Sequence, residues 1–185
     1  MTLVGFEGSL VTLRSIEADD ASQLHGVLEH RELRGRRYLE HEHTGPLGVA
    51  EVKKQIDAWQ EQRTGLALAV TSRRGEVVGH AVTEWEWDPL NASVAVVIDP
   101  RRWGGGLGGE ALLLLVDWVF SETVVTGIAC WVAGWNQRGL RFAEHHGFRP
   151  AGTERRTGVH GGRWFDTVVF DQLRDEWEES RASRG

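Results

Sequence analysis

Apolar residues in the first half of the chain follow two different spacings. Apolar and polar residues that alternate are typical of a half-buried strand, and the stretch SLVTLRSI has this pattern. Apolar residues three and four apart line one face of a helix, as in VAEVKKQIDAWQEQR. These spacings predict a strand at Ser9–Ile16, a helix at 17–30, a loop at Arg31–Gly48, a helix at Val49–Arg63, and a hairpin of two strands at 66–72 and 76–87.

The second half of the chain continues this succession of strands and helices. The pattern predicts a strand at Ser93–Pro100, a helix that ends near Glu122, a strand at 126–133, a helix at 136–148, and two closing strands that meet at Gly161–Gly162. The polar tail from Arg174 is expected to fray. No repeat or linker interrupts the chain, so we expect a single α/β or α+β domain over residues 1–185, with its core at about 9–177.

A run of glycines lies between the strand predicted at Ser93–Pro100 and the apolar helix, in DPRRWGGGLGGEALLLL (Asp99–Leu115). Glycine costs roughly 0.5–1 kcal/mol relative to alanine in regular structure, and a surface turn needs only one or two of them. A helix N-terminus has main-chain N–H groups without helical partners and a partial positive charge, and bare backbone lets phosphate oxygens reach these groups. We therefore predict that this loop binds a phosphate-containing ligand.

Two common phosphate-loop patterns fit this loop poorly. The Walker pattern requires Lys and Ser or Thr after its last glycine, and neither follows here. Gly104, Gly106 and Gly109 satisfy GxGxxG, but Pro100 separates them from the strand, and the next strand, TGIACWVA, has no terminal acid to hold a ribose. A nicotinamide-dependent oxidoreductase remains a remote alternative.

Composition and charge narrow the class of protein. The chain has 185 residues and a formal net charge of -6, which does not favour nucleic acid as a partner. Cys130 is its one cysteine, so we expect no disulfide framework. His41 and His43 have no third ligand at a sensible spacing, so we expect no metal site. The sequence shows no export signal and no membrane-length apolar run, and we expect a cytoplasmic protein without a membrane partner.

Two motifs, in order, resemble those of the GCN5-related N-acetyltransferase (GNAT) superfamily. VVIDPRRWGGGLGGEALLLLVDWVF is similar to its motif A, with Trp103 where Gln or Arg is usual and Gly106 and Gly108 at the two small positions. NQRGLRFAEHHGF is similar to its second signature, an Asn that opens a helix ending in Gly-Phe. The ending RRTGVHGGRWFDTVVFDQLRDEW resembles the RimJ/RimL-type branch, which acetylates ribosomal-protein N-termini. The resemblance covers about Leu10 to Trp177.

The resemblance implies a mixed, mostly antiparallel central sheet with helices on both faces. The strands at Ser93–Asp99 and Gly127–Val132 would run parallel and splay apart, with acetyl-CoA between them as the acetyl donor. The loop amides would hold its pyrophosphate, nearby backbone would polarise the thioester carbonyl, and two arginines would reach phosphate oxygens or stay solvated. The residues placed on this ligand by the resemblance are Val97, Ile98, Arg101, Arg102, Trp103, Gly104, Gly105, Gly106, Leu107, Gly108, Gly109 and Asn136.

The implied reaction is direct attack of a primary amine on the thioester in a ternary complex, and the amine must first lose a proton. In the strand GHAVTEWEWDP, one face would carry His80, Val82, Glu84 and Glu86. Glu84 is the first candidate for the general base, acting through water, and Glu86 is the second, although a solvated pair at a strand end fits equally well. Asn136, the third candidate catalytic residue, would cap its helix and contact the pantetheine arm.

The chain departs from the family pattern at the usual general acids. The position of the usual Tyr is Ala143, that of the branch's Ser is Gly139, and Ser93 stands where the branch commonly has Glu. Water can protonate the leaving thiolate, because a thiol near pKa 8.5 is a tolerable leaving group. A non-catalytic acyl-CoA-binding or sensing module is therefore the alternative to an enzyme.

The acceptor is left open by the sequence. A peptide or protein N-terminus, an antibiotic and a polyamine are all compatible with it, in a monomer or a homodimer. The charged loop HRELRGRRYLEHEHTG carries Glu40 and Glu42, which would meet a cationic amine or stay solvated. His145 and His146, in the last turn of the second-signature helix, are interpreted as solvated side chains favoured by the helix dipole.

Overall fold

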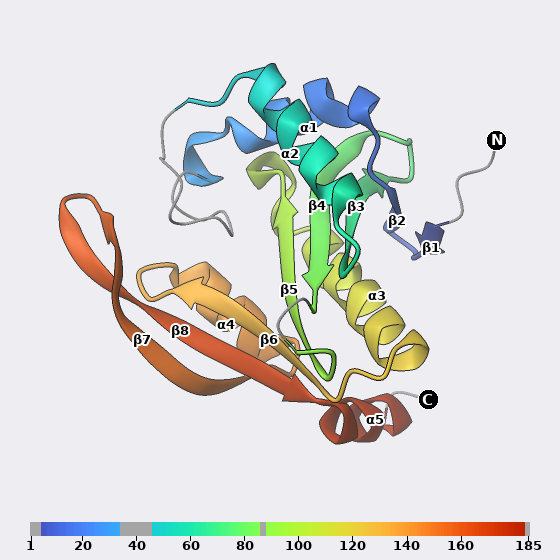
Figure 1. Ribbon diagram of the computed structural model, residues 1–185, viewed down its shortest axis with the longest axis vertical. Helices are drawn as coiled ribbons and strands as arrows, with labels where there is room; N and C mark the ends of the chain where they lie inside the picture. The colour runs from blue at the N-terminus through green and yellow to red at the C-terminus, as the bar shows by residue number, and fades with distance from the viewer. Residues whose placement is uncertain (1–4, 34–45, 86–87, 184–185) are drawn as a thin grey trace.

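The computed structural model describes residues 5–33, 46–85 and 88–183. In these residues one eight-stranded sheet runs through the molecule in the order β1-β2-β3-β4-β5-β6-β8-β7 (Figure 1). The strands are β1 (Gly5–Glu7), β2 (Val11–Ser15), β3 (Gly65–Ser72), β4 (Val77–Glu84), β5 (Asn91–Ile98), β6 (Gly127–Ala133), β7 (Arg149–His160) and β8 (Arg163–Leu173). The α-helices are α1 (Ala21–Leu28), α2 (Val49–Glu61), α3 (Leu107–Glu122), α4 (Gln137–His145) and α5 (Arg174–Ala182), and short 3-10 turns lie at Ala18–Asp20, Arg31–Leu33 and Pro100–Arg102.

One neighbouring pair of strands is parallel, and its two strands separate. β5 and β6 pair only from Asn91–Gly127 to Ser93–Ala129, whereas the other neighbouring strands described pair antiparallel. Both strands continue beyond this pairing, so their carboxyl halves diverge and leave a gap within the sheet. The predicted mixed, mostly antiparallel sheet with one splayed parallel pair is confirmed.

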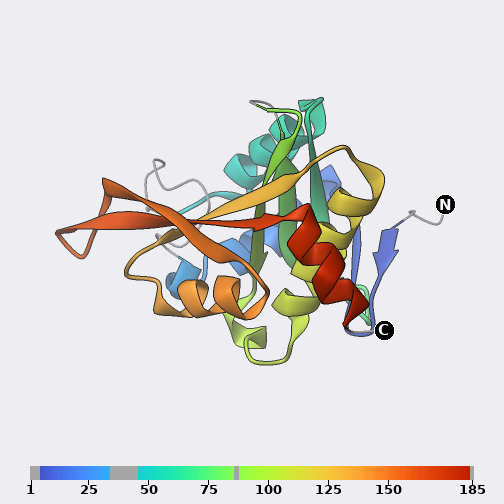
Figure 2. The same ribbon diagram turned by 90° about the horizontal axis from the view of Figure 1, so that it is seen from below.

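Helices cover both faces of the sheet and create two hydrophobic cores. α1 and α2 pack on β3 and β4 around Leu24, Ile56 and Ala69, while α3 packs on the opposite face around Leu115 and Phe120. Figure 2 shows the sheet from its end, with α2 on one side and α4 on the other. The helices on both faces that the family resemblance implied are therefore confirmed.

Strand β4 separates these two cores, as its alternation predicts. His80 faces α2, where its ring lies 5.0 Å from that of Trp59. Trp85, just after the strand, faces α3, with its ring 6.4 Å from that of Trp118. Glu84 shares the face of His80, since the two residues are four apart on the strand.

The C-terminal tail forms α5, so the prediction that it frays is wrong. Trp177 is buried against Phe120, with ring centroids 5.4 Å apart, and its indole N–H donates to Asp117 at 2.5 Å. Arg174 donates to carbonyl groups at and just after the C-terminal end of α3, where the helix dipole favours a cation. One aromatic residue in a polar stretch creates no periodicity, and for that reason the pattern misses this helix.

β7 and β8 form a long arm that projects from the body of the molecule (Figures 1 and 2). The predicted turn at Gly161–Gly162 is confirmed, and both glycines have positive φ. Near the end of the arm, the ring of Trp135 stacks on His160 with centroids 3.7 Å apart, and it meets Phe165 edge-on. The arm is therefore anchored on the segment between β6 and α4.

We expect Trp177→Ala to lower the free energy of unfolding by about 3–5 kcal/mol, because it removes a buried ring and its bond to Asp117. Trp164→Ala is the matched control: this ring is 65% exposed, and its loss should change the free energy by about 0.5 kcal/mol or less. Urea denaturation followed by circular dichroism measures both. Equal and small changes would show that α5 does not hold the fold together.

Candidate functional site

The segment between β5 and α3 contains two positions whose backbone conformation suits only glycine well. It begins at Asp99, whose carboxylate accepts a main-chain N–H at 3.0 Å and starts a short 3-10 turn. Gly104 (φ 85°) and Gly106 (φ 81°) then adopt the left-handed region that L side chains rarely adopt. α3 begins directly afterwards at Leu107, and the N–H groups of its first turn have no helical acceptor. The loop therefore presents main-chain donors at the positive end of a helix.

A cavity of about 620 Å³ opens at this loop and extends along α4. The carboxyl end of β5 and the first turn of α3 form one wall, and Asn136, Arg138 and Phe142 are part of the other. A smaller cavity of about 130 Å³ lies between the diverging halves of β5 and β6, next to Cys130. Asn136 and Phe142 line both, so the glycine loop and the gap in the sheet adjoin each other.

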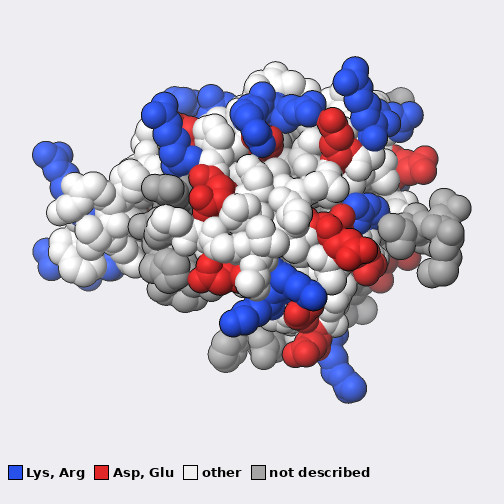
Figure 3. Space-filling view, turned by 90° about the horizontal axis from the view of Figure 1, so that it is seen from above, with Lys and Arg blue, Asp and Glu red and all other residues white. Residues whose placement is uncertain are grey.

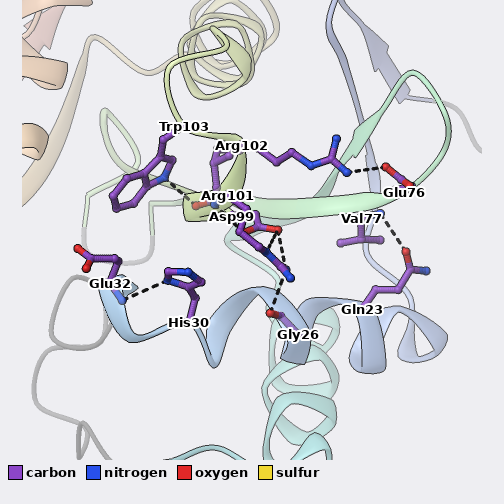
Figure 4. A network of polar contacts seen from close by, with 11 residues as sticks. Gln23, Gly26, His30, Glu32, Glu76, Val77, Asp99, Arg101, Arg102 and Trp103 are labelled. Carbon is purple, nitrogen blue, oxygen red and sulfur yellow. Dashed lines mark hydrogen bonds and ion pairs between the residues drawn. The ribbon is translucent and has the colours of Figure 1, made fainter.

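Most of the predicted ligand-binding residues line the larger cavity, namely Val97, Ile98, Arg102, Trp103, Gly104, Gly106, Leu107, Gly108, Gly109 and Asn136. Gly105 and Arg101 do not. The guanidinium of Arg101 donates to both carboxylate oxygens of Asp99, at 2.9 and 3.0 Å, and to the carbonyl of Gly26 in α1 (Figure 4). Burial alone would raise the pKa of Asp99, but these bonds outweigh it and hold that pKa below its usual range. Arg101 thus fastens the loop to α1 rather than facing the cavity.

Trp103 connects the loop to both walls of the cavity. Its indole N–H donates to the carbonyl of Ile98 at 3.0 Å (Figure 4). The guanidinium carbon of Arg138 lies 4.6 Å from its ring centroid, which is a cation–π contact. Arg102 instead pairs with Glu76 at 2.9 Å, where both side chains are about half exposed. Such surface pairs are weak, so Arg102 can exchange Glu76 for an anionic ligand at low cost.

Glu110 lies near the start of α3, but its charge is bound by a different part of the chain. Its carboxylate accepts the main-chain N–H groups of Ser9, Leu10 and Val11 at 2.6–2.8 Å, and the hydroxyl of Ser9 at 2.5 Å. Burial alone would raise the pKa of Glu110, but these bonds outweigh it and hold that pKa below its usual range. The turn between β1 and β2 therefore binds a negative charge that would otherwise compete for the N-terminus of α3. Nothing in the sequence indicated this contact.

Asn136 caps α4, as predicted, because its side chain accepts the N–H of Gly139 at 3.1 Å. A Cβ on Gly139 would lie 2.5 Å from Nδ2 of Asn136 and 2.8 Å from Cγ1 of Val132. A Ser at this position would require the side chain of Asn136 or Val132 to move. Ala143, at the family's Tyr position, is buried and lines the smaller cavity.

His146 is not simply solvated, so our interpretation of this side chain is wrong. Its Nδ1–H donates to the carbonyl of Phe142 at 2.8 Å, and its ring packs on that of Phe142. Its Nε2 approaches Gly109 so closely that a Cβ there would lie 2.5 Å away. His145 is exposed, as expected, and both histidines line the larger cavity.

Glu84, the first candidate base, lies at the end of β4 and lines neither cavity. It is half-buried, and its Oε1 accepts from Nε2 of Gln62, just after α2, at 3.3 Å. Its partner in the sheet is Ser93, the last residue of β5 that pairs with β6. Glu84 therefore stands on the α2 face, where the gap begins. The second candidate Glu86, and Glu40, His41, Glu42 and His43, lie outside the described residues.

Comparison with known proteins decides the family. A family model described as the acetyltransferase (GNAT) domain matches residues 11–149. The chain belongs to the GNAT family of N-acetyltransferases. One relative, the SPbeta prophage-derived uncharacterized N-acetyltransferase YokL of Bacillus subtilis, is 24% identical over 181 residues, which cover 96% of this chain and 98% of that protein.

Solved GNAT structures share this fold at low sequence identity. An acetyltransferase (GNAT family) from Bacillus anthracis matches with a TM-score of 0.80 and 17% identity, over 93% of this chain and 99% of that one. The spermidine N-acetyltransferase from Vibrio cholerae, solved in complex with CoA and spermine, matches with a TM-score of 0.80 and 19% identity, over 92% and 99% of the two chains. A GCN5-related N-acetyltransferase from Brucella melitensis matches with a TM-score of 0.78 and 24% identity, over 96% and 82%.

GNAT enzymes use acetyl-CoA, and the residues of this cavity fit that donor. A Cβ on Gly108 would lie 3.4 Å from Ile98 and 3.6 Å from Phe142, so the bare backbone of the helix start forms the cavity wall itself. No helix in the described residues is long and apolar enough to cross a membrane. The same residues contain no group of three His, Cys, Asp or Glu side chains placed to hold a metal ion.

We expect Glu110→Gln to lower the free energy of unfolding at neutral pH by about 1–3 kcal/mol, because several hydrogen bonds to a charge are weakened. The folded-state pKa lies below the unfolded one, so ionised Glu110 stabilises the fold at neutral pH, and this contribution disappears as the pH falls through the folded-state pKa. The difference between wild type and variant should therefore shrink below about pH 4. Glu122→Gln, at an exposed site on the same helix, is the control. Denaturation curves at several pH values give the test, and a pH-independent difference would contradict it.

Proposed function

We propose that this chain transfers the acetyl group of acetyl-CoA directly to a primary amine. The observation that carries the proposal is the position of the glycine loop at the mouth of the gap between β5 and β6. The main-chain N–H groups from Gly104 to Gly109 lie at the positive end of α3, where a diphosphate is stabilised. Arg102, Trp103 and Asn136 line the same cavity and complete the donor site.

The backbone of β5 supplies donors within the gap. The N–H of Asp99 donates to Val78 of β4, and antiparallel pairing alternates from there along the strand. Val97 therefore directs its N–H at β4, while Val96 and Ile98 direct theirs at the gap. We assign the N–H groups of Val96 and Ile98, rather than that of Val97, to the donor molecule: one polarises the thioester carbonyl, and the other binds the pantetheine arm. Polarisation of the carbonyl is the electrostatic contribution that usually dominates acyl transfer.

The thiol of Cys130 lies beside the gap but does not take the acetyl group itself. Burial raises its pKa to about 12, so at neutral pH it is a protonated and poor nucleophile. This favours direct attack by the amine over an acetyl-cysteine intermediate. In that step the amine nitrogen bonds to the acetyl carbon, the carbon–sulfur bond breaks, and CoA leaves as its thiolate.

Proton transfer is assigned to water and one carboxylate. Glu84 stands where the gap begins, on the face of the sheet that carries α2, and we propose that it accepts the amine proton through water. With Gly139 and Ala143 at the family's Ser and Tyr positions, the leaving thiolate takes its proton from water. A thiol near pKa 8.5 requires no stronger acid.

Two observations support two candidate classes of acceptor. The ending is similar to that of the RimJ/RimL-type branch, which supports a peptide N-terminus, and a structural neighbour was solved with spermine, which supports a polyamine. Release of free CoA thiol from acetyl-CoA over a panel of N-terminal peptides, polyamines and aminoglycosides tests these acceptors. Binding of acetyl-CoA without turnover of any amine would instead favour the non-catalytic module, and binding of NADH without CoA the oxidoreductase.

We expect Gly108→Val to weaken acetyl-CoA binding at least tenfold, or about 1.4 kcal/mol, because its side chain would enter the cavity between Ile98 and Phe142. The fold should persist, since valine is no worse than glycine in a helix. Gly152→Val, in open space on β7, is the control and should bind as wild type does. Calorimetric titration measures both, and unchanged affinity in Gly108→Val would remove the donor site from this loop.

A further inference from the structure

One face of the sheet formed by β6, β8 and β7 has no described helix packed on it. α4 packs on the other face, where Gly139 meets the side chain of Val132. Because side chains alternate along a strand, Trp131 points away from α4. Its side chain is 39% exposed, so part of the indole is accessible from solvent on this face. Figures 1 and 2 show this face of β6 and β8 beside the region that α1 and α2 cover.

Trp131 is paired on this face with a carboxylate from the arm. Its indole N–H donates to Oε1 of Glu154 at 3.2 Å. The register explains the contact: Trp131 lies opposite Val169 of β8, and Glu154 of β7 lies diagonally beyond, opposite Thr167. The hydrogen bond places the carboxylate of Glu154 at the edge of an indole that is partly exposed.

This pair lies beside the reacting end of the gap. Ala129 is the last residue of β6 that pairs with β5, and Trp131 follows it two positions later on the same face. Across the gap, Ser93 and its partner Glu84 share that face. An amine that approaches the gap from the side opposite α4 therefore passes between Glu84 and Trp131.

We propose that Trp131 and Glu154 bind a second cationic group of the acceptor, so that the preferred substrates are amines with at least two positive charges. An indole face and a carboxylate together favour a protonated ammonium. The nitrogen that attacks the thioester must be neutral, so a site that stabilises its protonated form would oppose the reaction. Trp131 and Glu154 therefore suit a different, protonated nitrogen of the same molecule. The inference rests on the proposed transfer to a primary amine.

A cation is attracted to this site by two neighbouring side chains, and not by a broad field of negative charge. Arg155 and Arg156 follow Glu154 directly, in a bulge of β7. Figure 3 shows acidic and basic side chains interspersed over the face that it displays, with basic ones at the free end of the arm. Recognition therefore depends on contact with this ring and this carboxylate, and it should discriminate closely related amines.

The experiment compares α,ω-diamines with monoamines of the same length in steady-state acetylation. In wild type the diamines should have the higher kcat/KM. Trp131→Ala and Glu154→Gln should each raise KM for the diamines about tenfold with little change in kcat, and should leave KM for monoamines and for acetyl-CoA unchanged. Trp131→Phe should retain part of the preference for diamines. When Trp131→Ala and Glu154→Gln are combined, the loss of binding free energy for diamines should be smaller than the sum of the two single losses.

Trp164→Ala and Glu178→Gln are the matched controls, since both residues are exposed and lie away from this pair. Calorimetric titration of the CoA-loaded protein with spermine gives a readout that needs no turnover. We expect spermine to bind to wild type, and its affinity for Glu154→Gln to be about tenfold lower.

Three results separate the two proposals. If no amine is acetylated while spermine binds at Trp131 and Glu154, the proposed function fails and this site stands. If amines are acetylated but the variants treat diamines and monoamines as wild type does, the site is wrong and the proposed function stands. If wild type shows neither a diamine preference nor spermine binding, the site is overturned whatever the activity.

Discussion

Backbone pairing between β5 and β6 ends at Ser93 and Ala129, and the rest of the site depends on that interruption. Beyond it, main-chain donors of β5 such as those of Val96 and Ile98 have no strand beside them, and buried N–H groups of this kind require a partner. β4 on one side and β8 on the other hold the two diverging strands in place. The gap is therefore a fixed feature of the sheet, built to receive another extended, hydrogen-bonding chain.

The glycine loop has little freedom, although it is rich in the most flexible residue. Arg101 fastens it to α1, Trp103 to β5 and α4, and Glu110 fastens the helix behind it to the β1–β2 turn. These contacts reach four parts of the chain: α1, β5, α4 and the β1–β2 turn. Holding the loop amides in place before a ligand arrives reduces the entropy lost on binding, which is the general advantage of a preorganised site.

Local pattern was enough to predict the order of the main helices and strands from β2 to β8, the cap at Asn136 and the glycine loop, because each depends on residues close in sequence. It missed β1 and α5 at the two ends. The contacts that complete the site join distant segments, and no local signal marks them. From the sequence, Glu110 is an ordinary acidic residue in the first turn of a helix, and Arg101 is a solvated cation. The structure instead bonds Glu110 to Val11 and Arg101 to Asp99. His146 resembles any residue of a last turn until α3 is placed beside it, and only the register of three strands brings Glu154 to Trp131.

The strand order places β8 between β6 and β7, although it follows both in the chain. Without β8, β6 would be an edge strand whose main-chain pairing is limited to its short contact with β5. One wall of the gap thus forms only when the chain has been translated nearly to Leu173, and α5 then closes the fold on Trp177. A chain that ends within the arm lacks the strand that holds β6 on the side away from β5, so one wall of its gap has no support.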